Sequence, residues 1–293
     1  MSNQLELRHI KYFLAVAEDL HFRKAAERLF ISQPGLSRQI KQMETDLGMV
    51  LFERHNRKVE LTKAGIYLKQ ELSRNLKHLD HIFSHAKLLH DGIGGDVKLG
   101  YVGSAMQNII PELLLRFKNT HNDILFSLVE MGNEKQIESL FSQDIDIGFV
   151  RLERAPRGIE IKPILKEVFC LVLPTDYDIN ELDFKNISQL KEESFILFDP
   201  EYSATYFEKV MQIFDDAGFV PNVSHKTIHA GSIYKLVENG FGVSIVPKSL
   251  CMENNKKIKF IELNKISQRT TLSVVWSKDN RNPVLEKILQ FVK

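Results

Sequence analysis

The sequence predicts a mixed fold class, with a mainly helical N-terminal part, one long helix and a C-terminal α/β body. Three observations predict it. Apolar residues recur at helical spacing up to about residue 47, residues 62–90 hold no proline, and short apolar strands alternate with amphipathic helices after residue 95. With 293 residues, 43% of them hydrophobic, the chain can form two or three compact domains.

Two short helices are expected at the N-terminus, each with one apolar side. The first side comprises Leu5, Ile10, Phe13, Leu14, Val16 and Ala17, and the second comprises Phe22, Ala25, Ala26 and Leu29. The two alanines allow close helix approach, and we expect Phe30 and Ile31 to supply apolar contacts in the connection that follows.

A third helix is expected between residues 32 and 48. Ser32 is a candidate N-cap, Pro34 suits the first helical turn, and Gly48 is a natural end. The predicted buried stripe consists of Leu36, Ile40, Met43 and Leu47.

Polar residues near the start of this helix fall on the opposite, outward side: Gln33, Ser37, Arg38 and Lys41. A solvated helix face is the alternative interpretation of such a stripe. A paired helix followed by a basic hairpin over residues 52–61 is typical of a winged helix-turn-helix, which places this helix start in the DNA major groove. There Gln33 suits adenine, Arg38 suits guanine or phosphate, and Pro34 can touch a thymine methyl.

Basic residues crowd the tip of the expected hairpin. We predict that Arg57 enters the minor groove, because a narrow minor groove concentrates negative potential around a guanidinium. For Arg54 two roles stay open: it contacts DNA, or it pairs with an acid such as Glu44 and orients the hairpin.

Charge is distributed unevenly along the chain. The formal net charge is +1, yet residues 1–91 contain 15 Lys and Arg against 11 Asp and Glu. The DNA-binding part is therefore the positive one, and its binding should be salt-sensitive. Neither Cys170 nor Cys251 is expected to belong to a redox or zinc pair, and we expect a reducing cytoplasm, without a signal peptide, membrane span, metal or cofactor.

The long helix carries apolar residues at alternating four- and three-residue steps, namely Leu72, Leu76, Leu79, Phe83 and Ala86. This rhythm is typical of a coiled-coil seam, so we expect the seam to meet a second copy of the chain, with the chain's own first helix as the alternative. Nearby histidines at helical spacing lack the carboxylates or cysteines of a metal site. The glycines of residues 91–96 predict the main domain boundary.

The C-terminal body shows two cycles of strand and helix. Expected strands cover residues 97–102, 124–131, 144–150, 194–199 and 242–247, and expected helices cover residues 106–119, 134–141, 204–217 and 232–239. Extended stretches near residues 151–163 and 261–270 join the cycles. We therefore expect two lobes, each with a mainly parallel sheet, and a crevice between them.

Three polar residues follow expected strands of the first lobe. Ser104 stands at a helix start, Asn133 follows the second strand, and Arg151 ends the third. Helix starts favour anions, so these residues predict an anion-binding crevice, although simple N-capping also explains a serine there. Enzymatic motifs such as GxGxxG, the P-loop, GxSxG and HExxH are absent, and Asp144 and Asp146 are interpreted as solvated edge residues.

The residues LRHIKYFLAVAEDLHFRKAAERLFISQPGLSRQIKQMETDLGMVLFERHNRKVELTKAG resemble the N-terminal part of LysR-type transcriptional regulators. The resemblance extends loosely over the whole chain. GYVGS, DIDIGFVRL and GFGVSIVP are most similar to regulators of aromatic-compound degradation that respond to muconate or benzoate.

This resemblance implies DNA contacts by Gln33, Pro34, Ser37, Arg38 and Arg57, and an effector contact by Ser104. Asn133 stands where similar regulators have threonine, and Tyr206 becomes a candidate crevice contact because FDPEYSATYF departs from their proline-rich loop. It further implies a two-lobed, periplasmic-binding-protein-like domain, homotetramers built as dimers of dimers, bent promoter DNA and recruitment of RNA polymerase.

The expected domains are a winged helix-turn-helix at residues 1–65, a linker and dimerisation helix at 66–91, and an effector-binding domain at 92–293. Within the last, one lobe covers about 95–162 and 266–293, and the other about 163–265. The alternative function is a two-lobed solute-binding protein without a regulatory role, which the helix-turn-helix opposes. A crevice enzyme is a weaker alternative.

Overall fold

The structure, a computed structural model, describes residues 5–55, 58–90, 94–252 and 255–292. The chain forms two compact units, Met1–Ser84 and His85–Lys293, each with its own hydrophobic core. The division falls inside the long helix. Residues 91–93 of the expected glycine-rich boundary lie outside the described residues.

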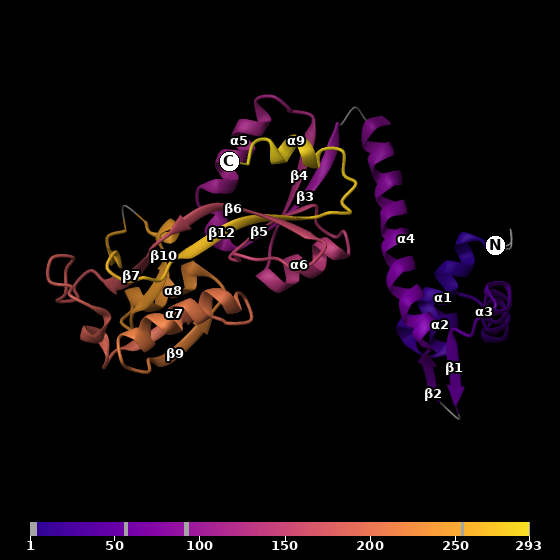
Figure 1. The fold of residues 1–293 in the computed structure, drawn as a ribbon, viewed down its shortest axis with the longest axis horizontal. Coiled ribbons are helices and arrows are strands. Elements are labelled where there is room, and N and C mark those ends of the chain that lie inside the picture. The colour runs from indigo at the N-terminus through magenta and orange to yellow at the C-terminus, as the bar shows by residue number, and fades with distance from the viewer. Residues whose placement is uncertain (1–4, 56–57, 91–93, 253–254, 293) are drawn as a thin grey trace. The chain divides into compact units, whose positions relative to one another are not determined.

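The first unit is a three-helix cluster with a two-stranded hairpin (Figure 1). Its elements are α1 Leu7–Asp19, α2 Phe22–Arg28, α3 Gln33–Leu47, β1 Phe52–His55, β2 Lys58–Leu61 and the start of α4 Lys63–His90. The strands are antiparallel, with Phe52 opposite Leu61. The expected winged helix-turn-helix architecture is confirmed.

Helix α3 has the ends and the buried side that its sequence predicts. The Ser32 hydroxyl accepts a hydrogen bond from the Gly35 N–H at 3.3 Å, and Gly48 ends the helix at φ +65°. Its side chains Leu36, Ile40 and Met43 are buried in the core of the unit. A left-handed residue at this position favours glycine, because an L side chain is strained there.

Two apolar residues of the first unit do not pack as expected. Leu5 precedes α1 and is 38% exposed, so it does not join the buried side of that helix. Phe30 is 95% exposed, because its backbone adopts φ +55° at the turn after α2 and directs the side chain outward. The prediction of an inward contact is wrong for both, whereas Ile31 packs against the core.

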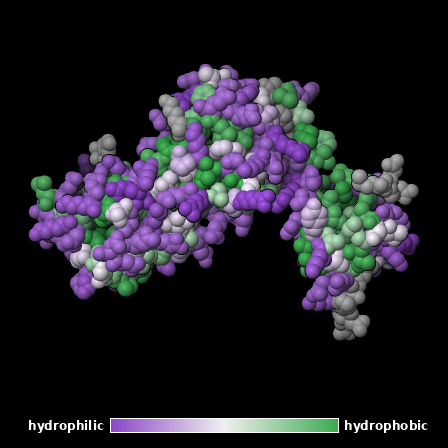
Figure 2. Space-filling view, viewed as in Figure 1, coloured by the Kyte–Doolittle hydropathy of each residue, from purple (hydrophilic) through white to green (hydrophobic). Residues whose placement is uncertain are grey.

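Helix α4 runs as one element to His90, as predicted, but its apolar seam divides into two parts. Leu72 and Leu76 pack against the core of the first unit, and the Lys69 ammonium donates to the Ala17 carbonyl of α1 at 2.9 Å. Farther along, Phe83 is 64% and Leu89 56% exposed. Figure 2 shows hydrophobic side chains along α4. The later part of the helix therefore offers an apolar face to a partner.

The first lobe of the second unit is a five-stranded sheet in the order β4-β3-β5-β12-β6. Helices α5 and α9 supply side chains to one core of this lobe, and α6 contributes to another. Its elements are β3 Gly95–Tyr101, η1 Gly103–Met106, α5 Ile109–Lys118, β4 Ile124–Glu130, α6 Asn133–Phe141, β5 Ile147–Val150, β6 Ile159–Glu167, β12 Thr270–Ser277 and α9 Leu285–Leu289.

The second lobe contains a three-stranded sheet, β10-β7-β11, and a parallel pair, β8-β9. A bridge between Phe195 and Val243 joins the two sets of strands, and α7 and α8 pack on them. The elements are β7 Phe169–Pro174, η2 Ile187–Leu190, β8 Ser194–Phe198, α7 Ala204–Asp216, β9 Asn222–Thr227, α8 Ala230–Glu238, β10 Ser244–Pro247, η3 Lys248–Leu250 and β11 Ile258–Glu262.

The sheets are mixed rather than mainly parallel, which corrects the prediction. Strands β3, β4 and β5 are parallel, but β12 is antiparallel to both β5 and β6, and β7 is antiparallel to both of its neighbours. The reason is the connection between the lobes: the chain leaves the first lobe along β6 and returns along β12, which lies beside it (Figure 1). One strand of this pair must run against the other. No helix in the described part of the chain is long and apolar enough to cross a lipid bilayer.

Candidate functional site

The start of α3 presents the polar residues that the sequence singled out. Gln33, Pro34, Arg38 and Lys41 are exposed and Ser37 is half-buried, while the opposite side of the helix enters the core. This orientation is the one that a helix-turn-helix needs to bring side chains to base edges.

The cations of α2 and α3 differ in their partners. On α2, Arg23 pairs with Glu27 at 2.9 Å and Arg28 pairs with Glu18 at 2.8 Å. Hydrogen bonding to Glu18 raises the pKa of Arg28. Within the described ranges, Arg38 and Lys41 have no carboxylate partner. The cations of α3 are therefore the ones available for DNA, because no acid has to be displaced.

Glu44 orients the entry to the hairpin through the backbone. Its Oε1 accepts hydrogen bonds from the N–H groups of Leu51 at 2.8 Å and Phe52 at 3.1 Å. Arg57 lies outside the described residues, and so does the side chain of Arg54. The two roles of Arg54 thus stay predictions, but an anchoring role of Glu44 toward the hairpin is observed.

We expect Glu44→Ala to loosen the hairpin without unfolding the unit. Two partly buried N–H groups would lose their acceptor, which costs about 1–3 kcal/mol. Hydrogen–deuterium exchange at the Leu51 and Phe52 amides should therefore accelerate. Glu44→Gln is the matched control, because its amide oxygen still accepts both bonds. Unchanged exchange in Glu44→Ala would contradict the anchoring role.

A buried histidine of α1, His9, which carries no predicted role, holds α3 against α1. His9 Nδ1 accepts the Glu6 N–H at 3.1 Å, so its Nε2 carries the proton and donates to Gln39 Oε1 at 2.8 Å. The contact fixes the rotation of α3 and with it the direction of the polar residues. Only the position of His9 on the inner side of α1 could have signalled this role.

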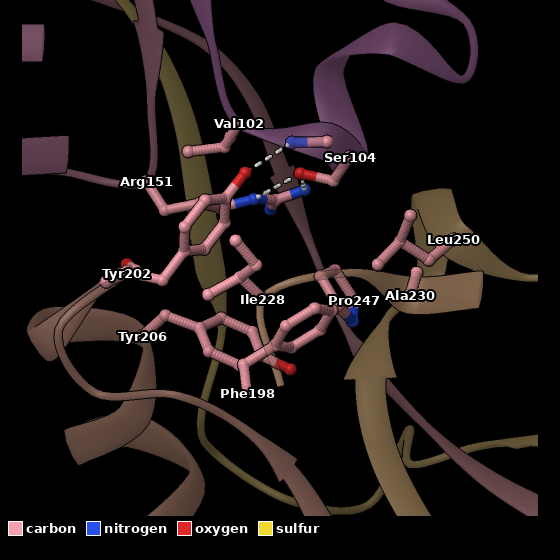
Figure 3. A pocket seen from close by; sticks show the side chains of 12 residues that line it. Val102, Ser104, Arg151, Phe198, Tyr202, Tyr206, Ile228, Ala230, Pro247 and Leu250 are labelled. Atoms are coloured by element: carbon pink, nitrogen blue, oxygen red, sulfur yellow. Dashed lines mark hydrogen bonds between the residues drawn. The ribbon is translucent and has the colours of Figure 1, made fainter. Parts of the chain in front are cut away.

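The second unit contains a crevice of about 400 Å³, counting its open mouth, between residues of both lobes. Figure 3 shows Ser104 and Arg151 facing each other at one end, and the rings of Phe198, Tyr202 and Tyr206 close together. The other lining residues are Val102, Gly103, Ser203, Ile228, Ala230, Pro247 and Leu250. The crevice thus combines one polar end with mainly apolar walls, an arrangement that suits a small ligand with a polar head.

Arg151, at the end of β5, is the centre of the polar end. Its guanidinium donates to the Ser104 hydroxyl from Nε at 3.1 Å and from one terminal nitrogen at 3.0 Å. It also donates to the hydroxyls of Thr270 at 3.3 Å and Ser249 at 3.0 Å. The side chain is only 3% exposed. Four chain segments therefore meet on one buried cation.

Glu167 balances the charge of Arg151. The closest nitrogen and oxygen are 2.5 Å apart, and the glutamate side chain is 6% exposed. Its two oxygens also accept the Ser249 N–H at 2.6 Å and the Ser249 hydroxyl at 2.9 Å. Neither Glu167 nor Ser249 was predicted as a site residue, since neither stands in a motif and 82 residues separate them.

Asn133 lies behind the crevice lining. It accepts the Arg151 N–H at 3.0 Å and donates to the Ser203 hydroxyl at 2.8 Å, while its own N–H donates to the Tyr202 carbonyl at 3.0 Å. Gly132 permits this contact, because a Cβ there would lie 2.6 Å from the Tyr202 carbonyl oxygen. The side-chain amide therefore ties the lobes together beside Arg151.

Two tyrosines line the crevice: Tyr206, which was predicted as a crevice contact, and Tyr202, which was not. Tyr206 donates to the Ile245 carbonyl at 3.1 Å, and Tyr202 accepts the Gly103 N–H at 3.0 Å and donates to Glu130 at 3.1 Å. Burial raises the pKa of both phenols, so both are neutral donors at physiological pH.

One acid near β5 is placed differently from its prediction. Asp146 is buried, not a solvated edge residue: it accepts the Lys98 N–H at 2.8 Å and the Asn280 amide at 3.4 Å. It therefore stabilises the junction of β3 and β5, and has no catalytic arrangement with Asp144, which is exposed.

Comparison with protein families assigns both ends of the chain. Residues 7–66 match the family described as "Bacterial regulatory helix-turn-helix protein, lysR family", and residues 90–293 match "LysR substrate binding domain". Among known proteins, the chain is 30% identical to the HTH-type transcriptional regulator AlsR of Bacillus subtilis over 97% of this chain and 94% of AlsR. It is 32% identical to ClcR of Pseudomonas putida over 98% of each chain.

Solved structures show the same architecture over the full length. CbnR in complex with its target DNA has a TM-score of 0.69 and 28% identity, covering 98% of this chain and 99% of that one. The solute-binding alternative is therefore set aside, because the DNA-binding part is matched together with the crevice. The chain belongs to the LysR family: it is a DNA-binding transcriptional regulator with a C-terminal effector-binding domain.

Proposed function

We propose that this regulator responds to a small carboxylate with an apolar body, an aromatic or dicarboxylic acid, bound in the crevice of the second unit. The observation that carries the proposal is the Ser104–Arg151 contact at the polar end of mainly apolar walls. The Ser104 hydroxyl already accepts two N–H groups, so its own proton is directed to another acceptor. A carboxylate oxygen of the effector is that acceptor.

Glu167 is the group that a bound effector carboxylate would have to displace from Arg151. Because Arg151 is already paired, an incoming carboxylate competes with Glu167 for the guanidinium. Displacing Glu167 also changes its bonds to Ser249, which belongs to the other lobe. Effector binding is thus coupled to the arrangement of the lobes, and only a difference in affinity between two arrangements shifts the population.

The remaining parts of the proposal concern the assembled protein. Through Gln33, Pro34, Ser37, Arg38, Lys41, Arg54 and Arg57 it binds and bends promoter DNA in the cytoplasm. The exposed later part of α4 supports a homodimer, and we propose that pairs of dimers form a tetramer that contacts RNA polymerase. The functional division at residues 1–65, 66–91 and 92–293 belongs to the same proposal.

Isothermal titration with matched ligands tests the effector class. Benzoate and muconate should bind, and benzamide, which has the shape of benzoate without its charge, should bind more weakly because it cannot compete with Glu167. Equal binding of benzoate and benzamide would contradict a carboxylate-selective crevice. Absence of turnover after incubation with the same acids is expected, since we propose that the crevice performs no catalysis.

We expect Ser104→Ala to reduce the effector response while sparing DNA affinity. Loss of one hydrogen bond to a charged group costs about 1.5–3 kcal/mol, so effector affinity should fall about tenfold to hundredfold. Promoter binding and induction are measured side by side. Ser277→Ala is the control. Ser277 is also buried, but it lies at the end of β12 opposite Thr270, the residue that contacts Arg151. Unchanged induction in Ser104→Ala would remove Ser104 from the site.

A further inference from the structure

Helix α2 ends with a phenylalanine at a backbone position that favours glycine. The Phe30 N–H donates to the Glu27 carbonyl at 3.2 Å, and the Ile31 N–H donates to the Ala26 carbonyl at 3.1 Å. Phe30 itself adopts φ +55°. Together these features form a Schellman motif, whose left-handed residue is strained when it carries an L side chain.

Other helices of the chain end with the same pair of hydrogen bonds but with a different residue at this position. Helices α3, α7 and α8 have glycine there, at φ +65°, +77° and +74°: Gly48, Gly218 and Gly240. Helix α6 has a polar residue, Gln143, at φ +58°. Among the described helices with this ending, α2 therefore differs in placing a large apolar side chain at the strained position.

Packing does not offset the strain at Phe30. The side chain is 95% exposed, so its ring lies in water and contributes almost no hydrophobic stabilisation to the fold. The neighbouring Ile31, by contrast, packs against the core of the unit. A strained backbone conformation without a compensating contact inside the chain points to a role in binding.

Phe30 lies next to the residues that are expected to contact bases. Gln33 is the first residue of α3 and comes three positions after Phe30, so their Cα atoms are at most about 11 Å apart. That distance spans about three base-pair steps of DNA. Because the start of the recognition helix enters the major groove, the Phe30 ring is within reach of the same stretch of groove.

The chemistry of a phenyl ring selects its partner in that groove. The ring carries no polar hydrogen-bonding group, so it cannot recognise the donors and acceptors of the base edges. The apolar group that the major groove displays is the C5-methyl of thymine, and this methyl distinguishes thymine from the other three bases. Contact between the ring and the methyl removes apolar surface from water when DNA binds, which is favourable.

We propose that Phe30 is a specificity-determining residue that packs on the C5-methyl group of one thymine, next to the bases that the start of α3 reaches. This role adds to the DNA contacts assigned from the polar side of α3, and it does not depend on the effector or its crevice. The strained turn presents the ring, and the thymine methyl supplies the apolar contact that the folded chain does not give it.

Removal of single methyl groups from the DNA tests this contact. The full-length wild-type protein first selects a duplex from a pool of random sequence. Each thymine of that duplex is then replaced singly by uracil, which lacks the methyl group and keeps the same hydrogen-bonding groups. Fluorescence anisotropy at one salt concentration measures each affinity. For at least one thymine we expect wild-type affinity to fall about fourfold, the effect of one buried methyl group.

The variant Phe30→Asn links that effect to the ring. We expect it to bind the thymine and uracil duplexes equally at the position that Phe30 contacts, whereas a thymine contacted by Pro34 keeps its methyl dependence. Asparagine tolerates a left-handed backbone, so hydrogen exchange of the α2 and α3 amides should stay the same or slow down.

Three results would overturn the proposal. The first is a wild-type protein that shows no dependence on any thymine methyl group. The second is a Phe30→Asn variant that keeps every methyl dependence of the wild type. The third is faster hydrogen exchange throughout α2 and α3 in Phe30→Asn, which would assign Phe30 to the stability of the fold.

Leu20→Asn is the matched control. Leu20 ends α1 at φ +45° and is 44% exposed, so the substitution removes another apolar side chain from a left-handed position of the same unit. We expect it to leave the methyl dependence of every thymine unchanged. Loss of the same dependence in Leu20→Asn would attribute the effect to relief of backbone strain and reject the contact.

Discussion

Arg38→Ala should lose specific DNA binding with little change in non-specific binding. Arg38 is exposed on the outward side of α3, and no acid of the described residues holds it. A bidentate contact to a base contributes about 1–3 kcal/mol of discrimination, which is a roughly 5- to 150-fold change in affinity. Fluorescence anisotropy with a promoter duplex and a scrambled duplex at one salt concentration measures the ratio.

Arg23→Ala is the matched control for that experiment. It removes the same charge from the neighbouring helix, but Arg23 is engaged with Glu27 and is 79% exposed. We expect it to leave the ratio of specific to non-specific affinity unchanged. An equal loss on both duplexes in Arg38→Ala would assign this residue to the phosphate backbone and contradict base recognition.

Arg151→Met should strongly destabilise the effector-binding unit. The substitution leaves the Glu167 carboxylate buried with Ser249 as its remaining partner among those described above. Breaking a buried pair by removing one partner costs about 3–5 kcal/mol. Urea unfolding followed by the fluorescence of Trp276 in β12, the single tryptophan of the chain, reports the stability of this unit.

The double variant Arg151→Met/Glu167→Met separates the ion pair from general packing. With both charges removed, neither group is left uncompensated, so we expect the double variant to be more stable than Arg151→Met alone. If the decrease in unfolding free energy of the double variant equals the sum of the decreases of the two single variants, the residues do not act as a pair. A decrease in unfolding free energy below about 1 kcal/mol in each single variant would match an exposed rather than a buried ion pair.

Local sequence was sufficient wherever one helix or its cap determined the structure. The N-cap Ser32, the end at Gly48 and the buried side of α3 followed from spacing, and they place Arg38 on the outside. Phe30 was mispredicted, because hydrophobicity alone does not reveal a left-handed backbone that turns the side chain to solvent. Helical spacing predicts which side chains face inward within a helix, but it does not predict the direction of a side chain in the turn that follows.

The crevice was predicted only in part, for a different reason. Ser104 and Arg151 follow strands of one lobe, so strand order was enough to bring them together. Glu167 and Ser249 come from the crossing strand and the other lobe, and their charge and hydroxyl acquire a role only when the lobes meet. The mixed strand directions were not predicted. The pattern of residues in β12 identifies a strand, but it does not specify whether that strand runs parallel or antiparallel to its neighbours.

The sequence by itself determined the winged helix-turn-helix, the long helix and the two α/β lobes, because each depends on periodicity, caps and breaks within about thirty neighbouring residues. Only the tertiary structure decided that Arg151 is paired with Glu167 and that Asn133 joins Arg151 to Ser203 of the other lobe. Contacts between residues that are far apart in sequence depend on how strands pair and cross, and one sequence carries no local signal of that pairing.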